Sequence, residues 1–219
     1  MQNRILSFKS FEIKSAAGLD PLPIQIREPI NPERVFRFRA SDDTVDRYGD
    51  VILASGWRLS DYVKNPVIMA FHDYSRWPIG VADAVGIVDN ALMIDCEFDP
   101  PDVDEAADLV FRKIKQGTVK SGSVGFSWNR CVMANEKGAE QYFKNYPQAR
   151  RIFLEQDLIE FTICPLPANP NALAASVGFS NGNGVEIQRQ ADAPRFCEQA
   201  VMDRLARIEK SLKTGEQNG

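Results

Sequence analysis

The stretch KSGSVGFSW, residues 120–128, alternates in the manner of a β-strand and places a serine between two glycines. At a period of two, Val124, Phe126 and Trp128 share one face, and Ser123 lies on the opposite face. The small neighbours of this serine leave room for the backbone of a substrate. A serine hydroxyl becomes a good nucleophile once an adjacent base takes its proton. The stretch therefore predicts a strand that carries Ser123 as a candidate nucleophile.

His72 is the single histidine of the chain, so any serine–histidine chemistry must use it. It follows the apolar run at residues 66–71, which predicts a buried strand, and it precedes a polar and aromatic loop. This position is expected at the edge of a cleft. If His72 is a general base, activity should rise with pH as the imidazole loses its proton. A hydrogen-bonded structural histidine is the alternative.

A histidine base usually needs an acceptor on its second ring nitrogen, which fixes the tautomer and stabilises the imidazolium. Residues 152–164 alternate as a strand and carry Glu160 among largely apolar positions, so Glu160 is the first candidate. Asp73, Asp95 and Glu97 are competing acids. By pattern alone, Glu160 fits equally well as an exposed carboxylate on the face of a strand.

Further elements are predicted on both sides of these residues. They are a half-buried strand at residues 34–40, a hairpin at residues 79–98, a helix at residues 102–117 and a polar surface excursion at residues 129–151. The hairpin should turn at Asp89 and Asn90. The helix should begin at Asp102, with Glu105 three residues later as in a capping box, and should end at Gly117.

Length and composition predict one principal domain without a cofactor. The chain has 219 residues, a formal net charge of -4 and no long basic run, so nucleic acid is not an expected partner. Its four cysteines lack CxxC pairs, and one histidine cannot form a His-rich metal site. No apolar run of the sequence approaches the length of a membrane span, which is about 20 residues. Residues 1–20 also lack an apolar run as long as that of a signal peptide, so association with a membrane is not expected.

Four acids gather in one polar segment of the sequence. They are Asp42, Asp43, Asp46 and Asp50. Their spacing is not that of a calcium-binding loop, and the terminal glutamate of such a loop is missing. This segment is therefore predicted to be a solvated turn.

Four segments of the chain, in order, match the pattern of a known family. They are NPVIMAFHD (residues 65–73), PIG (78–80), KSGSVGFS (120–127) and LIEFTICPLPANPNA (158–172). Across residues 36–174 the chain thus resembles the prohead, or head maturation, proteases of tailed bacteriophages. These are serine peptidases whose fold is similar to that of the herpesvirus assemblin protease.

The resemblance assigns roles to individual residues. The histidine of the family falls on His72, its serine on Ser123 and its acid on Glu160. Thr162 stands where the family pattern has a serine, which is a departure. Herpesvirus proteases use a second histidine as the third member, and this chain has none. The carboxylate of Glu160 is therefore the remaining candidate for the third member.

The resemblance also implies an α+β, mainly β fold: a small, mostly antiparallel β-barrel with a few surrounding helices, as in herpesvirus proteases. We expect residues 1–30 to form an N-terminal arm or initial strand and residues 31–177 to form the serine protease domain. Residues 178–219 are expected to form a linker and a short amphipathic helix. A further hypothesis makes this last segment an assembly or targeting tail that self-cleavage removes.

The implied function is that of a serine endopeptidase of phage capsid assembly. It would cleave the scaffold-like segment of the major capsid protein or a separate scaffold protein, and itself, inside the assembling procapsid in the host bacterial cytoplasm. The resemblance to the herpesvirus protease fold is compatible with a homodimer. Two alternatives stay open: a catalytically inactive scaffolding protein on the same fold, and an esterase that uses the same residues on small substrates.

Overall fold

The computed structural model describes residues 24–175. The linker and amphipathic helix expected within residues 178–219 lie outside the described residues, as do residues 1–23 of the expected arm. The division of the chain into arm, domain and tail therefore stays a prediction.

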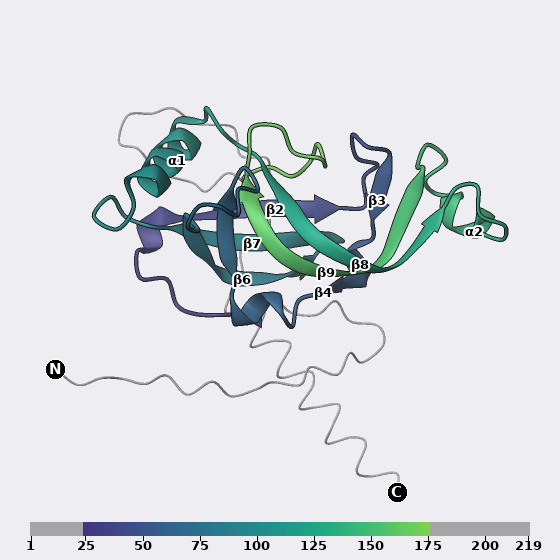
Figure 1. Ribbon diagram of the computed structural model, residues 1–219, viewed down its shortest axis with the longest axis horizontal. Helices are drawn as coiled ribbons and strands as arrows, with labels where there is room; N and C mark the ends of the chain where they lie inside the picture. The colour runs from purple at the N-terminus through teal and green to yellow at the C-terminus, as the bar shows by residue number, and fades with distance from the viewer. Residues whose placement is uncertain (1–23, 176–219) are drawn as a thin grey trace, which may run out of the picture.

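One curled, mixed sheet organises the described residues, and Figure 1 shows the curvature of its long strands. Its strands are β1 (Ile24–Gln25), β2 (Val35–Asp42), β3 (Asp50–Ile52), β4 (Trp57–Arg58), β5 (Val67–Ala70), β6 (Gly80–Val88), β7 (Ala91–Phe98), β8 (Gly122–Met133) and β9 (Arg151–Ile163). The main path runs β2-β7-β6-β5-β9-β3, with β1 beside β6 and with β4 and β8 beside β9. The mainly β character expected from the sequence is confirmed.

The two directions of strand pairing are distributed unevenly. β9 pairs parallel with β3, β4 and β5, whereas its pairing with β8 is antiparallel. The pairs β1–β6, β2–β7, β5–β6 and β6–β7 are also antiparallel. The described sheet is thus antiparallel over β1, β2, β6 and β7 and mixed around β9. A barrel related to the herpesvirus proteases stays a prediction.

The helices of the described part are few and short. They are α1 (Glu105–Gln116), α2 (Glu140–Phe143) and the 3₁₀ turns η1 (Pro32–Arg34), η2 (Ala54–Gly56) and η3 (Tyr62–Lys64). The expected start of α1 at Asp102 is wrong, because a turn that follows Pro100 comes first and Asp104 is the N-cap. The carboxylate of Asp104 accepts a hydrogen bond from the Ala106 N–H. The expected end is confirmed, because Gly117 adopts the left-handed conformation that closes many helices.

Two local predictions for the N-terminal half are confirmed. In β2, Phe36, Phe38 and Ala40 are buried in the core, as the alternation of that segment predicts. β6 and β7 form the expected hairpin, and Asp89 and Asn90 both have positive φ at its turn. Two left-handed residues are what the twist of a two-residue hairpin turn requires.

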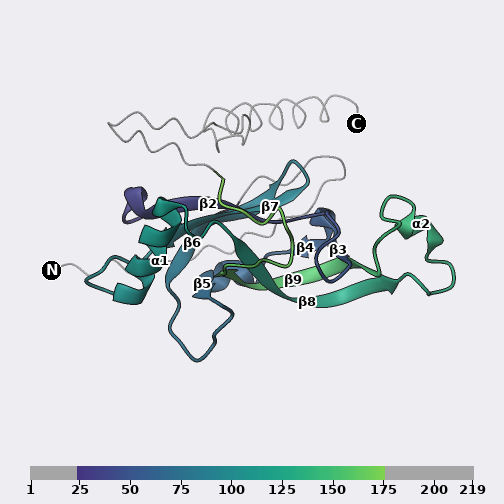
Figure 2. The same cartoon turned by 90° about the horizontal axis from the view of Figure 1, so that it is seen from above.

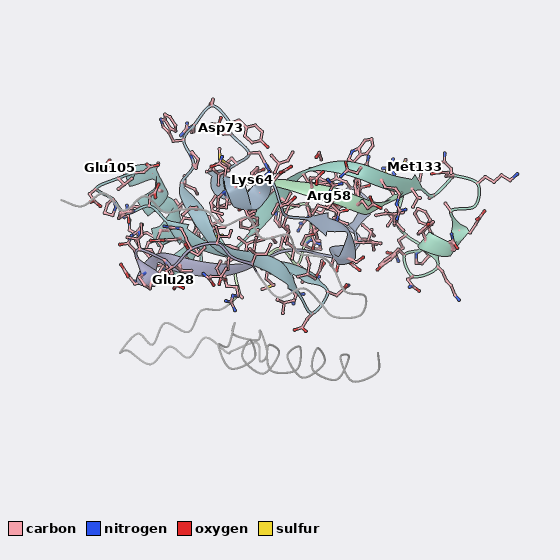
Figure 3. All side chains as sticks on the ribbon, turned by 90° about the horizontal axis from the view of Figure 1, so that it is seen from below. Glu28, Arg58, Lys64, Asp73, Glu105 and Met133 are labelled. Atoms are coloured by element: carbon pink, nitrogen blue, oxygen red, sulfur yellow. The ribbon has the colours of Figure 1, made fainter. Side chains whose placement is uncertain are left out.

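The boundaries expected for the polar excursion are wrong. β8 continues to Met133 and β9 begins at Arg151, so the ladder between them extends into the segment expected to be a surface excursion. Figures 1 and 3 show this hairpin projecting from the rest of the fold, with α2 near its tip. A separate apolar cluster that includes Val51, Ile152 and Leu154 packs at its base. Cross-strand pairing therefore keeps exposed polar residues in a strand that their own pattern does not predict.

Candidate active site

The candidate residues meet on one face of β9. β5 and β8 both pair with residues 161–163 and so lie on opposite edges of β9, as Figure 2 shows. Ser123 of β8 is the cross-strand partner of Thr162, and Gly125 is the partner of Glu160. Directly opposed residues of antiparallel strands project to the same face. Ser123, Thr162 and Glu160 therefore share a face.

His72 reaches this face through a sharp turn after β5. Phe71 and His72 have φ values of 58° and 55°, in the left-handed region that residues with a side chain rarely adopt. The Phe71 N–H donates to the Ile163 carbonyl at 3.0 Å, and the His72 N–H donates to Thr162 Oγ1 at 3.0 Å. The turn thus folds the chain back toward β9, and Figure 3 shows the loop beyond it, with Asp73 labelled, projecting from the fold.

The imidazole of His72 contacts the carboxylate of Glu160. Its Nδ1 lies 2.5 Å from Glu160 Oε1. The Glu160 side chain is 1% exposed, whereas that of His72 is 40% exposed. The carboxylate is therefore buried, whereas the imidazole is partly open to solvent. The alternative of an exposed strand-face carboxylate at Glu160 is wrong.

A tyrosine from the projecting loop also reaches the acid. The Tyr74 hydroxyl donates to Glu160 Oε1 at 3.4 Å. Partial burial raises the pKa of Tyr74, and the nearby negative charge of Glu160 and this hydrogen bond raise it further. Glu160 Oε2 is buried without a hydrogen-bond partner among residues 24–175. The carboxylate therefore directs its polar contacts in the described structure through Oε1, toward His72 and Tyr74.

The two glycines that flank Ser123 serve a different purpose from the one expected. A Cβ on Gly125 would lie 2.3 Å from Glu160 Oε1 and 2.9 Å from its Cδ, and a Cβ on Gly122 would lie 2.2 Å from Phe161 Cζ. The space is thus occupied by side chains of β9, and it is not room left for a substrate. Gly125 is what allows the carboxylate of Glu160 to lie against β8.

Ser123 is 9% exposed and lies near the start of β8. Among the described residues no hydrogen bond joins its hydroxyl to His72, although both residues adjoin Thr162. With Nδ1 of His72 held by the carboxylate, Nε2 is the nitrogen left to exchange a proton. The arrangement can therefore orient and polarise an imidazole on the face of the sheet that carries a serine hydroxyl.

The competing acids are engaged elsewhere. Asp73 accepts hydrogen bonds from Ser75, and Asp95 pairs with Arg37. Glu97 pairs with Arg27. Of the acids weighed from the sequence, the structure brings Glu160 alone to the histidine.

The acidic segment after β2 is not the solvated turn expected from its composition. Asp42 and Asp50 are buried. Asp50 pairs with Arg151, and Asp42 accepts hydrogen bonds from Asn169 and Asn171, which ties the segment after β9 to β2. Within the described range, no group of histidine, cysteine and acidic residues is arranged to hold a metal ion. The acids of this segment are structural.

Sequence reasoning missed three residues of this site: Thr162, Tyr74 and Gly125. Thr162 was visible only as a departure from a family pattern, although it keeps the hydroxyl that this pattern has. Its period-two spacing from Glu160 was the available signal. Tyr74 and Gly125 could be recognised only once the partner of each in space was known.

The chain is similar in sequence to known proteins. The sequence profile described as caudovirus prohead serine protease matches residues 35–183. The prohead protease of Escherichia phage T5 is 32% identical over 158 residues, which cover 69% of this chain and 67% of that relative. No solved structure matches. No helix among residues 24–175 is long and apolar enough to cross a membrane.

Proposed function

The chain belongs to the caudovirus prohead serine protease family, and on that basis we propose that Ser123, His72 and Glu160 are its catalytic triad. The observation that carries this proposal is the contact between the partly exposed imidazole of His72 and the buried carboxylate of Glu160. Ser123 projects from the same face of the sheet, one strand away.

In the proposed mechanism, Ser123 Oγ attacks the carbonyl carbon of the scissile peptide bond while His72 Nε2 takes its proton. The protonated imidazole then gives this proton to the leaving amine, and the peptide bond breaks to leave an acyl-enzyme ester on Ser123. Water, activated in the same way by His72, hydrolyses the ester. The hydrogen bond between Ser123 and His72 forms when substrate is bound, since such contacts often tighten only then.

The burial of Glu160 supports its role as the third member. A carboxylate that holds Nδ1–H fixes the tautomer in which Nε2 can accept a proton. The positive charge that forms on the imidazole in the transition state is then stabilised by a negative charge in a poorly solvated environment. Tyr74 donates to the same oxygen, which further restricts the orientation of the carboxylate.

The substrates we propose are the scaffold-like segment of the major capsid protein or a separate scaffold protein, and the chain itself. Proteolysis would take place inside the assembling procapsid, in the cytoplasm of the host bacterium. A barrel of herpesvirus-protease type and a homodimer are the corresponding proposals for fold and assembly. The family membership supports these proposals, while the geometry supports the chemistry.

The test is to co-express the chain with the neighbouring capsid protein and to compare fragment masses for wild type, Ser123→Ala and Ser127→Ala. Ser127 is an exposed serine of the same strand and provides the matched control. We expect wild type and Ser127→Ala to cleave the capsid protein and Ser123→Ala to leave it intact. Cleavage by Ser123→Ala at the wild-type rate would contradict the proposed nucleophile.

The intact masses of the protease chains in these samples test self-cleavage. We expect wild type to shorten and Ser123→Ala to keep its full mass. If wild type leaves both itself and the capsid protein whole while particles still assemble, a scaffolding role replaces the enzymatic one.

A further inference from the structure

From the hydrogen bonds around the turn after β5, we infer that Thr162 is a positioning residue for the reaction. Its hydroxyl holds the backbone of His72 in the conformation that brings the imidazole to Glu160 and to the face of Ser123. The inference rests on the proposed triad, and it concerns what keeps the base of that triad in place.

The turn that carries His72 needs such support. Phe71 and His72 are consecutive residues with side chains, and both are left-handed. Such residues persist only where the surroundings determine their conformation. The last pair between β5 and β9 is Ala70 with Ile163, so His72 already lies beyond the regular ladder. Its N–H must therefore find an acceptor outside the normal pairing of strands.

Thr162 supplies this acceptor with a side chain. The His72 N–H donates to Thr162 Oγ1 at 3.0 Å, and the Thr162 side chain is fully buried. The contacts on each side use backbone carbonyls: the Phe71 N–H donates to Ile163 and the Asp73 N–H donates to Ala70. Of the acceptors for these three consecutive N–H groups, the Thr162 hydroxyl is thus the one that belongs to a side chain.

Thr162 lies beside all three members of the proposed triad because of its position on β9. It lies two residues after Glu160 on the same face and directly opposite Ser123. One strand face therefore fixes His72 twice: Thr162 binds its backbone and Glu160 binds its ring. Without the hydroxyl, the His72 N–H loses its partner and the turn can relax toward solvent, which withdraws the imidazole from the carboxylate.

Two substitutions separate this role from simple packing. Thr162→Val keeps the shape of the side chain and removes the oxygen, whereas Thr162→Ser keeps the oxygen and removes a methyl group. A buried residue that only packs should tolerate valine and be weakened by serine. A positioning hydroxyl gives the opposite order, and Thr162→Ala serves as a second oxygen-free variant.

The first experiment measures kcat and KM with a peptide that spans the cleavage site found in the capsid protein. We expect Thr162→Val to lose about 10- to 100-fold in kcat with KM nearly unchanged, because a displaced base slows the chemical step. Thr162→Ser should stay close to wild type. Equal losses in the serine and valine variants, or full kcat in an oxygen-free variant, would overturn the inference.

The second experiment does not depend on activity. His72 is the single histidine, so the imidazole NMR spectrum of the untagged full chain reports this residue alone. In a Ser123→Ala background, we expect a protected Nδ1–H signal that persists in Thr162→Ser and is lost in Thr162→Val. A signal that survives in Thr162→Val would overturn the inference even if Ser123 proves to be the nucleophile. Activity in Ser123→Ala would instead contradict the triad.

Discussion

Two of the places where the fold buries carboxylates use them differently. Glu160 is buried against the partly exposed His72. On β6 and β7, Asp83 and Glu97 are also buried, and both pair with Arg27 from the segment after β1. Glu97 also accepts hydrogen bonds from backbone N–H groups of that segment. We call these two regions the histidine site and the arginine site.

The two sites differ in the partner of the acid and not in whether the acid is buried. Arginine keeps its charge at any pH that proteins tolerate, so Arg27 remains a cation beside Asp83 and Glu97, and its pairs fasten residues 27–31 to the sheet. Histidine gains and loses a proton under ordinary conditions. A buried acid beside it can therefore stabilise a charge that appears during a reaction.

The largest expected effect separates the two sites by activity. Glu160→Gln should lower kcat/KM by about 10³- to 10⁴-fold, because the amide cannot hold the imidazole in its required tautomer and charge state. Glu97→Gln should leave the activity of each folded molecule nearly unchanged. Both variants are assayed on the capsid-derived peptide, with circular dichroism to measure the folded fraction. Similar activities in the two variants would remove the distinction between the sites.

At the arginine site, we expect a large effect on the free energy of unfolding. Arg27→Met leaves Asp83 and Glu97 without their cation, so the free energy of unfolding should fall by about 3 kcal/mol. The control is Arg58→Met, which breaks an exposed pair with Asp157 and should cost less than about 1 kcal/mol. Urea unfolding measures both changes. Equal losses in the two variants would mean that the arginine site is not a structural clamp.

A smaller effect on kcat is expected from a substitution at Gly125, beside the carboxylate of the histidine site. Gly125→Ala places a methyl group against the carboxylate of Glu160, which has little space to move. We expect kcat to fall about 10- to 50-fold from this displacement. In a Glu160→Gln background the same change should have little further effect, as a double-mutant cycle would show. Independent, additive losses would mean that Gly125 acts by another route.

The smallest expected effect is a pH dependence of stability at the arginine site. Burial raises the pKa of Asp83 from 3.8 to about 6; Arg27 opposes this shift, while Glu97 and Asp95 add to it. The folded state therefore holds the proton more tightly than the unfolded state. The resulting stabilisation is complete at low pH and is lost as the pH rises through about 6.

This dependence is measurable by urea unfolding at pH 5 and pH 7.5. Asp83 should account for a loss of about 1 kcal/mol between these values. Asp83→Asn cannot titrate, so its stability should fall less than that of wild type over this range. A loss as large as that of wild type would show that other groups cause it.

Local patterns predict part of this structure well. The alternation around Phe38 and the turn at Asp89 and Asn90 depend on neighbours in sequence, and both are correct. The burial of Glu160 is not local, because the residues around its carboxylate, Gly125, His72 and Tyr74, are distant in the sequence. The same alternation would describe an exposed acid, so the sequence pattern could not decide between them.

The errors have the same origin. Asp42 and Asp50 read as a polar turn because their partners, Asn169 and Arg151, lie more than a hundred residues away. The length of β8 was underestimated because its outer residues are held by β9 and not by apolar alternation. For the candidate site, family resemblance supplied the candidate residues, while their burial and contacts required the fold.

The position of β9 in the chain has a consequence for synthesis. It is the last strand along the described residues, and it pairs with β3, β4, β5 and β8, all made before it. Domains rich in such distant pairings fold slowly, since long loops must close first. Glu160 and Thr162 are thus among the last described residues to leave the ribosome. A nascent chain that ends before them holds both the serine and the histidine, yet it lacks the strand that would bring the two together.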